Sequence, residues 1–272
     1  MTKSMLAFPN KAAAVLSLVL LTACAPDITE TDFYQRHPDP SELEPPEAMT
    51  IAESTADGFT LTLAAREALH AGYNRVLVKV VEGEAVVPFA TVQLRATLGD
   101  RTAPVDRASV GEPDEDGFVE AGVYFLQPKG EAQTWALELA VAAEGRTVQT
   151  TFEVAVEDAL WMQALDQDEP LYLSWVQPSR PVTGDDAYIL ALHRPTDTGF
   201  EAVTDAALDL YPYMDMGGGD GHSTPFAAPT HQAEGIYEGR VNFIMAGGWD
   251  MTVYVQRGSD RAEVLFDDFI VY

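Results

Sequence analysis

The 272-residue chain has a single cysteine, Cys24, and few basic residues. One cysteine has no partner within the chain, so a small disulfide-stapled fold is excluded. Lysine and arginine together number 16, against 43 aspartates and glutamates, and the formal net charge is −27. A surface of this charge repels phosphate backbones, so we expect no nucleic-acid partner.

Motifs that carry catalytic chemistry are also lacking. The sequence has no G-x-S-x-G nucleophile elbow, no dinucleotide-binding loop and no phosphate-binding loop. The pattern also places no pair of carboxylates on one surface. The sequence therefore predicts a protein that is not an enzyme and that has no catalytic residues.

The first residues have the pattern of a targeting segment. Lys3 and Lys11 provide a positive start, and the apolar stretch 12–21 is too short to span a bilayer comfortably. Residues 21–24 read Leu-Thr-Ala-Cys, which resembles the bacterial lipobox, whose cysteine is diacylated and becomes the new N-terminus. An ordinary secretory signal with an incidental cysteine is the alternative interpretation.

The lipobox interpretation predicts a lipoprotein signal peptide at residues 1–23 and a membrane anchor on Cys24. Ala25 follows the cysteine, where many enteric lipoproteins retained in the inner membrane have aspartate, so we expect an outer-membrane protein with a periplasmic or surface face. Residues 24–50 are rich in proline, aspartate and glutamate and have little apolar periodicity. Such a composition buries too little surface to order itself, so this segment is predicted to be a tether.

The remainder of the chain contains an internal repeat. Residues Gly117–Phe125 align without gaps on Gly235–Phe243, and a tryptophan follows in each half, Trp135 and Trp249. Short runs of alternating apolar and polar residues, separated by Gly, Pro and Asp turns, surround both copies, and this alternation is typical of half-buried strands. The matching tryptophans indicate core packing in both halves.

These patterns predict an all-β protein with two tandem antiparallel immunoglobulin-like β-sandwiches. The first is expected at residues 51–158 and the second at residues 170–272. Residues 159–169 break the alternation, and we interpret them as a short helical or irregular linker.

Two segments of the second half carry a family resemblance. They are "MDMGGGDGHSTP", Met214–Pro225, and "FIMAGGW", Phe243–Trp249. The second half, over residues 200–272, resembles the YtkA-like/FixH-like domain, and residues 60–157 resemble it more weakly. The resemblance implies the sandwich fold and, through the link of FixH to maturation of a copper-containing respiratory oxidase, a role with copper. FixH is anchored by a membrane helix, and this sequence departs from it by lacking such a helix after its signal.

The same segments contain candidate ligands for a soft metal ion. Thioether and neutral imidazole groups suit Cu(I). The candidate ligands are Met214, Met216, His222, His231 and Met245. Met214 and Met216 would share one face of a strand. However, that face also holds Leu208 and Leu210, so the alternative interpretation is a core strand that continues into a flexible glycine loop.

Two functions remain open at this point. The first is a non-catalytic binding module of the cell envelope that presents its loops to an envelope protein, whose identity the sequence does not indicate. The alternative is a periplasmic Cu(I)-binding or copper-delivery protein that uses the Met/His loop. Cu(I) is the only cofactor that the sequence suggests.

Overall fold

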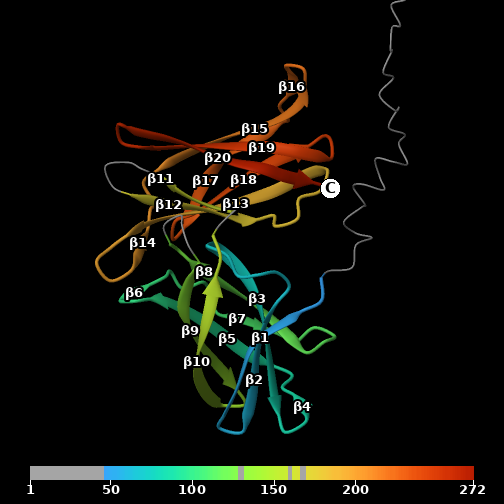
Figure 1. The fold of residues 1–272 in the computed structure, drawn as a ribbon, viewed down its shortest axis with the longest axis vertical. Coiled ribbons are helices and arrows are strands. Elements are labelled where there is room, and N and C mark those ends of the chain that lie inside the picture. Colours follow the sequence, from blue (N-terminus) through green and yellow to red (C-terminus); the bar gives the residue numbers. More distant parts are fainter. Residues whose placement is uncertain (1–45, 128–131, 159–160, 166–169) are drawn as a thin grey trace, which may run out of the picture. The chain divides into compact units, whose positions relative to one another are not determined.

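A computed structural model describes residues 46–127, 132–158, 161–165 and 170–272. Every element in this part of the chain is a β-strand, as predicted for an all-β fold (Figure 1). The signal peptide, the lipidation site Cys24 and most of the tether lie outside the described residues. In the described ranges we find no helix with the length and apolarity needed to cross a bilayer.

The first sandwich consists of two antiparallel sheets. The strands of its first sheet are β1 (Met49–Ala56), β2 (Phe59–Ala65), β3 (Gly72–Glu82), β4 (Ala85–Val86) and β8 (Phe118–Phe125). The strands of its second sheet are β10 (Arg146–Val156), β9 (Gln133–Ala143), β5 (Ala90–Leu98), β6 (Arg101–Thr102) and β7 (Ser109–Gly111). Strand β3 lies between β2 and β8, and β9 lies between β10 and β5, so β3 and β9 form the centres of the two sheets.

The second sandwich follows the same strand order with one exception. The strands of its first sheet are β11 (Met162–Leu165), β12 (Leu171–Gln177), β13 (Gly184–Pro195), β14 (Phe200–Ala202), β17 (Phe226–Ala233) and β18 (Ile236–Phe243). The strands of its second sheet are β15 (Ala207–Gly217), β16 (Asp220–His222), β19 (Gly247–Arg257) and β20 (Asp260–Val271). Strand β13 pairs with β12 and β18 as β3 pairs with β2 and β8, so the sequence repeat is a repeat of topology. The exception is that β17 pairs with β18 in the first sheet, whereas the counterpart β7 pairs with β5 in the second sheet of the first sandwich.

The register of the repeated strands matches at the level of single residues. Phe125, the last residue of β8, lies opposite Gly72, and Phe243, the last residue of β18, lies opposite Gly184. The two glycines begin their strands with φ angles of +104° and +119°. Side-chain-bearing residues rarely adopt such angles, so glycine is required at the same point of both sheets. The predicted equivalence of the two halves is therefore confirmed in three dimensions.

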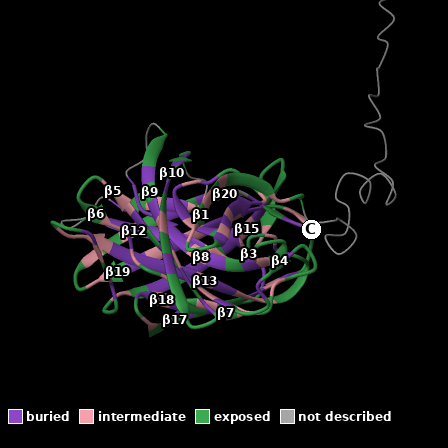
Figure 2. Ribbon diagram, turned by 90° about the horizontal axis from the view of Figure 1, so that it is seen from below, coloured by how far each residue is buried: buried purple, intermediate pink, exposed green. Residues whose placement is uncertain are grey.

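Alternation along the strands produces an apolar core in each sandwich, and the first cluster also includes Met162, Tyr172 and Ala191 from strands of the second sandwich. Figure 2 shows buried stretches mainly in the strands and exposed stretches mainly in the loops. At the end of each core a phenylalanine ring meets a tryptophan edge to face, with ring centroids 5.4 Å apart for Phe125–Trp135 and 5.4 Å apart for Phe243–Trp249. Pairs of this geometry contribute about 0.5–1.5 kcal/mol beyond the area they bury.

The segment predicted as a helical or irregular linker contains a strand. Residues 162–165 form β11, which pairs with β12 at the edge of the second sandwich. Met162 and Leu165 at its two ends are buried, Met162 in the first core and Leu165 in the second. Four residues are too few to show a period in the sequence, and the strand is stabilised by its neighbour. At the other boundary, the first sandwich begins at Met49, inside the predicted tether.

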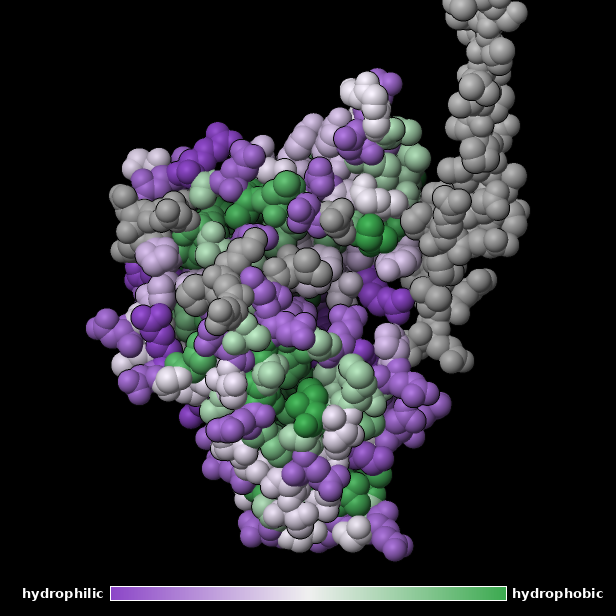
Figure 3. All heavy atoms as spheres, viewed as in Figure 1, coloured by the Kyte–Doolittle hydropathy of each residue, from purple (hydrophilic) through white to green (hydrophobic). Residues whose placement is uncertain are grey.

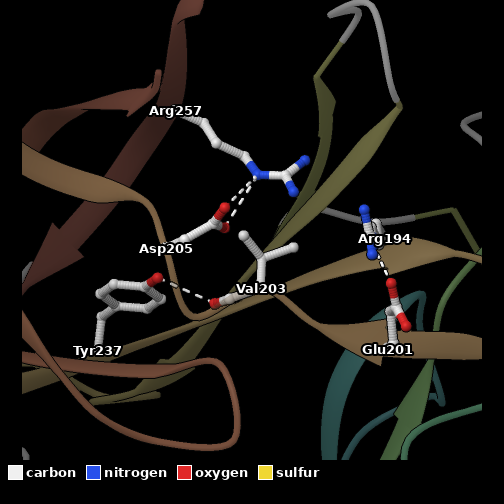
Figure 4. A network of polar contacts seen from close by, with 6 residues as sticks. All are labelled: Arg194, Glu201, Val203, Asp205, Tyr237 and Arg257. Carbon is white, nitrogen blue, oxygen red and sulfur yellow. Dashed lines mark hydrogen bonds and ion pairs between the residues drawn. The ribbon is translucent and has the colours of Figure 1, made fainter.

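Polar contacts fix the loop between β14 and β15 (Figure 4). The Tyr237 hydroxyl, whose ring lies in the second core, donates to the Val203 carbonyl at 2.9 Å. Arg257 Nε donates to Asp205 at 2.9 Å from Oδ1 and 3.1 Å from Oδ2. The buried tyrosine satisfies its only polar group in this way, and the loop is held against the sheet.

We expect the two cores to respond separately to loss of their tryptophans. Trp249→Ala should lower the free energy of unfolding of the second sandwich by about 3–5 kcal/mol, because it leaves a large cavity. Trp135→Ala, the matched variant, should do the same to the first. Hydrogen exchange read by mass spectrometry checks this: protection should fall in β18 and β19 for the first variant and in β8 and β9 for the second. Equal loss in both sandwiches from either variant would contradict separate cores.

Candidate functional site

The Met/His segment forms a hairpin at one end of the second sandwich. Strand β15 turns at Gly217, Gly218 and Gly219, whose φ angles are +82°, +69° and +90°, and returns as β16. This return places His222 directly opposite Met214 in the register. Two of the candidate ligands, separated by eight positions in the sequence, are therefore cross-strand neighbours.

The two methionines of β15 have different environments. Met214 is only 7% exposed and belongs to the second core, as its shared parity with Leu208 and Leu210 predicts. Its Cε lies 3.2 Å from the point where a Cβ on Gly247 would stand, so a side chain at Gly247 would press on the thioether. Met216, two residues further, is 60% exposed because the core ends before it.

One ring nitrogen of His222 is hydrogen bonded within the described part of the chain, and the other is not, which is the pattern common among metal-binding histidines. Its Nδ1 lies 3.2 Å from the Ser223 carbonyl oxygen, which can only accept, so a neutral ring carries its proton on Nδ1. The other nitrogen, Nε2, is buried and has no hydrogen-bond partner among the described residues. Metal-binding histidines commonly donate one N–H to a carbonyl and coordinate through the other nitrogen.

The wall beside His222 is aromatic. The imidazole meets the indole of Trp249 edge to face, with ring centroids 5.5 Å apart and an interplanar angle of 80°. Trp249 is itself 1% exposed and anchored by its indole N–H, which donates to the Met245 carbonyl at 3.1 Å. Trp249 therefore packs in the core, as predicted, and also shields one side of the imidazole from water.

The backbone carbonyl of Met245 accepts the Trp249 indole N–H and so holds the turn, while the Met245 side chain is 42% exposed. In the first sandwich the corresponding acceptor is the Gln127 side chain, whose Oε1 receives the Trp135 indole N–H at 2.8 Å. A tryptophan that needs one hydrogen-bond acceptor is thus satisfied by a side chain in one repeat and by a carbonyl in the other. The methionine side chain is left free to face outward.

His231 does not join this group. It lies on β17 opposite Tyr237, with ring centroids 5.3 Å apart, near the start of β18. Phe243, which packs on Trp249, is at the other end of β18. Six residues of strand separate Tyr237 from Phe243, roughly 20 Å at ~3.3 Å per residue. The expectation that His231 could close the ligand set is wrong, because pairing with β18 carries it away from the hairpin.

The hairpin end therefore offers one buried thioether, Met214, and one partly buried imidazole, His222, whose Nε2 is buried, together with the exposed thioethers Met216 and Met245. The described residues contain no cluster of three or more His, Cys, Asp or Glu side chains suited to a metal ion. Carboxylate-rich sites for hard cations and thiolate or His-carboxylate sites for Zn²⁺ need such clusters. The donor set at Met214 and His222 is soft, and it fits Cu(I) best among the common ions.

Sequence reasoning missed an apolar surface at the same end. Ile244 is 54% exposed and lies in the β18–β19 turn beside Met245, and Met216 projects from the neighbouring strand β15. We call Met216, Ile244 and Met245 the hairpin-end surface. In the space-filling view, weakly hydrophobic residues lie at the base of the projecting β15–β16 hairpin (Figure 3). The signal in the sequence was an apolar Ile-Met pair after the last core residue of a strand.

The first sandwich has a shorter version of the hairpin. Leu98, the counterpart of Met214, pairs with Arg101 across the two-residue turn Gly99–Asp100. Because His222 pairs with Met214 as Arg101 pairs with Leu98, the register identifies Arg101 as the counterpart of His222. The two repeats therefore differ in the length and chemistry of the hairpin and agree in the core beneath it.

Part of the second half matches a known protein-family model. Residues 166–254 match the family model described as YtkA-like. This range confirms the resemblance in the second sandwich and begins earlier than the residues that first suggested it. No curated protein matches the chain.

Several solved structures match much of the chain at low identity. Invasin, a bacterial integrin-binding protein, matches 76% of this chain and 38% of its own at 12% identity, with a TM-score of 0.25. Domains 5–6 of the S-layer protein SbsC match 83% of this chain and 98% of theirs at 9% identity, with a TM-score of 0.33. The Escherichia coli adhesin FdeC matches 81% of this chain and 66% of its own at 12% identity, with a TM-score of 0.26. The chain thus spans well under half of invasin, the first of these.

Proposed function

Starting from the YtkA-like domain at residues 166–254, we propose that the protein is a non-catalytic binding module of the bacterial envelope, anchored by lipid at Cys24. Its partner is an envelope protein with an apolar surface. The proposal does not depend on a whole-protein likeness to any adhesin. It depends on the hairpin end of the second sandwich.

The observation that carries the proposal is the exposure of Met216 on β15, at 60%, and of Ile244 and Met245 on the β18–β19 turn, at 54% and 42%. The Met245 carbonyl holds the buried Trp249 indole, so the turn cannot fold its apolar side chains inward without breaking that bond. Flexible methionine side chains adapt to partner surfaces at low cost. Fixed backbone beneath adaptable apolar side chains is an arrangement suited to protein binding.

Photo-crosslinking in intact cells tests this function. A photoreactive amino acid at position 216 should give a discrete crosslinked species, and the additional change Ile244→Asp should abolish it, because a carboxylate in the contact would be desolvated. Position 100 is the matched control, since Asp100 is the exposed hairpin residue of the first sandwich that corresponds to Met216. Crosslinks that form equally at position 100, or that persist with Ile244→Asp, would contradict a partner at the hairpin-end surface.

The anchor has a separate test. Cys24→Ser should move the protein from the membrane fraction to the soluble fraction, because a serine cannot receive the thioether-linked lipid and the net negative charge of the chain gives no general attraction to a membrane surface. Mass spectrometry of the wild-type N-terminal peptide should show diacylation of Cys24. Unchanged membrane retention of the serine variant, or an unmodified Cys24, would count against the anchor and would leave the hairpin-end surface to be judged by its own experiment.

A second candidate function is Cu(I) handling, and one observation favours it. The buried Nε2 of His222 has no hydrogen-bond partner and lies on the strand that faces Met214. A buried nitrogen without a partner costs about 1–3 kcal/mol, and coordination of an ion would offset that cost. Met214 and His222 would hold Cu(I), with Met216 or Met245 supplying a further thioether from the surface.

Competition titration of Cu(I) against a chromogenic chelator under reducing conditions tests this candidate. His222→Ala and Met214→Leu should each weaken Cu(I) binding at least tenfold. Leucine keeps the volume of the core residue while removing the sulfur, so the fold should persist. His231→Ala is the matched control and should leave the affinity unchanged, since His231 lies on β17 opposite Tyr237, at the far end of β18 from Phe243. Equal Cu(I) uptake by the wild type and the His222→Ala/Met214→Leu double variant would exclude the site.

A further inference from the structure

A cavity of about 210 Å³ lies where the loop between β2 and β3 meets Trp161 and residues 175–180. Three of its lining residues are arginines and two are tryptophans. They are Arg66, Arg75, Arg180, Trp161 and Trp175. In a chain with 16 basic and 43 acidic residues, three arginines around one cavity are a local concentration of positive charge.

One of these arginines is neutralised and two are not. Arg75 Nη1 lies 3.0 Å from Glu120 Oε1, in an exposed ion pair, and Arg75 Nη2 donates to Gln177 at 3.3 Å. Glu67 is the other acidic residue of the lining. Neither Arg66 nor Arg180 forms an ion pair with a carboxylate in the described part of the chain.

Both unneutralised arginines are nevertheless held in place. Arg66 Nη1 donates to the Pro46 carbonyl at 2.7 Å, and the Arg180 guanidinium lies over the Tyr272 ring, 5.8 Å from its centroid. A carbonyl and an aromatic ring orient a guanidinium without cancelling its charge. Each guanidinium keeps N–H donors that these contacts do not use. Oriented charge with spare donors is what recognition of a carboxylate or phosphate requires.

The aromatic side of the cavity is also braced. The Trp175 amide donates to the Trp161 carbonyl at 2.7 Å, and the Trp175 indole N–H donates to the Pro178 carbonyl at 3.2 Å. Trp161 is partly buried, and its ring meets Phe269 edge to face, with ring centroids 5.2 Å apart. A volume of 210 Å³ is below the roughly 300–1,000 Å³ of sites for drug-sized molecules. The occupant must therefore be small.

We propose that this cavity binds a small anion, whose carboxylate or phosphate group is held by Arg66 and Arg180 and whose apolar body packs on Trp161. The anionic group can belong to a free small molecule or to a phospholipid headgroup, and the chemistry of recognition is the same. The site is independent of the hairpin-end surface and of Cu(I), so its test does not depend on either.

Binding to the full chain in detergent solution tests the proposal, with benzoate, inorganic phosphate and phosphatidylglycerol vesicles as probes. Benzamide has the same ring as benzoate and no charge, and phosphatidylcholine vesicles are the corresponding control for the lipid. Binding of the small probes is followed by tryptophan fluorescence and calorimetry, and vesicle binding by co-sedimentation. We expect benzoate to bind at least fivefold more tightly than benzamide.

The variants assign the effect to the two arginines. Arg66→Gln/Arg180→Gln should weaken the affinity for the probe that binds the wild type at least tenfold. Arg95→Gln, which replaces an exposed arginine on β5, should change that affinity less than twofold. Arg66→Lys/Arg180→Lys keeps the charge and should retain part of the binding, which separates loss of charge from loss of fold. Loss of benzoate or phosphate binding in the glutamine variant identifies a free anion, and loss of vesicle binding alone identifies a headgroup. If no probe distinguishes the wild type from the glutamine variant, the proposal is wrong.

Discussion

The packing of a tryptophan on a phenylalanine at the end of each core is the interaction on which the rest of the molecule depends. In the second sandwich Trp249 can be buried only if its indole N–H finds an acceptor, and the Met245 carbonyl is that acceptor. The turn that supplies the carbonyl must then present the side chains of Ile244 and Met245 to solvent. The hydrogen bond that the buried Trp249 needs thus determines that Ile244 and Met245 are exposed at the surface.

The fold could be predicted because its signals are local. Strands half buried in a sandwich alternate with period two, and the repeat of residues 117–125 at 235–243 aligns two stretches that both end on a buried phenylalanine. The parity of Met214 with Leu208 and Leu210 also predicted its burial correctly. The strand at residues 162–165 was missed because it is defined by pairing with β12, which leaves no period in four residues.

The candidate sites depend on pairing between segments that are distant in the sequence, and local sequence patterns contain little information about such pairing. Met214 and His222 meet because a glycine turn returns the chain by a specific number of residues, whereas His231 is moved away by its register against β18. Arg66 and Arg180 come to one cavity from separate loops, and nothing near either in the sequence marks it as different from other arginines. The burial of a single residue can be deduced from the alternation along its strand, but the meeting of several side chains at one site cannot.

The two hairpins show how one scaffold acquires different chemistry. In the first sandwich Leu98 meets Arg101 across a two-residue turn, and in the second Met214 meets His222 across a longer glycine turn. The change in length occurs beyond the last core pair, so insertions there leave the packing of both sheets intact. After a duplication, one repeat can keep a short hairpin while the hairpin of the other repeat changes in length and gains residues that bind new ligands or partners. In evolutionary terms, the hairpin is the position where this protein can vary its function without risking its stability.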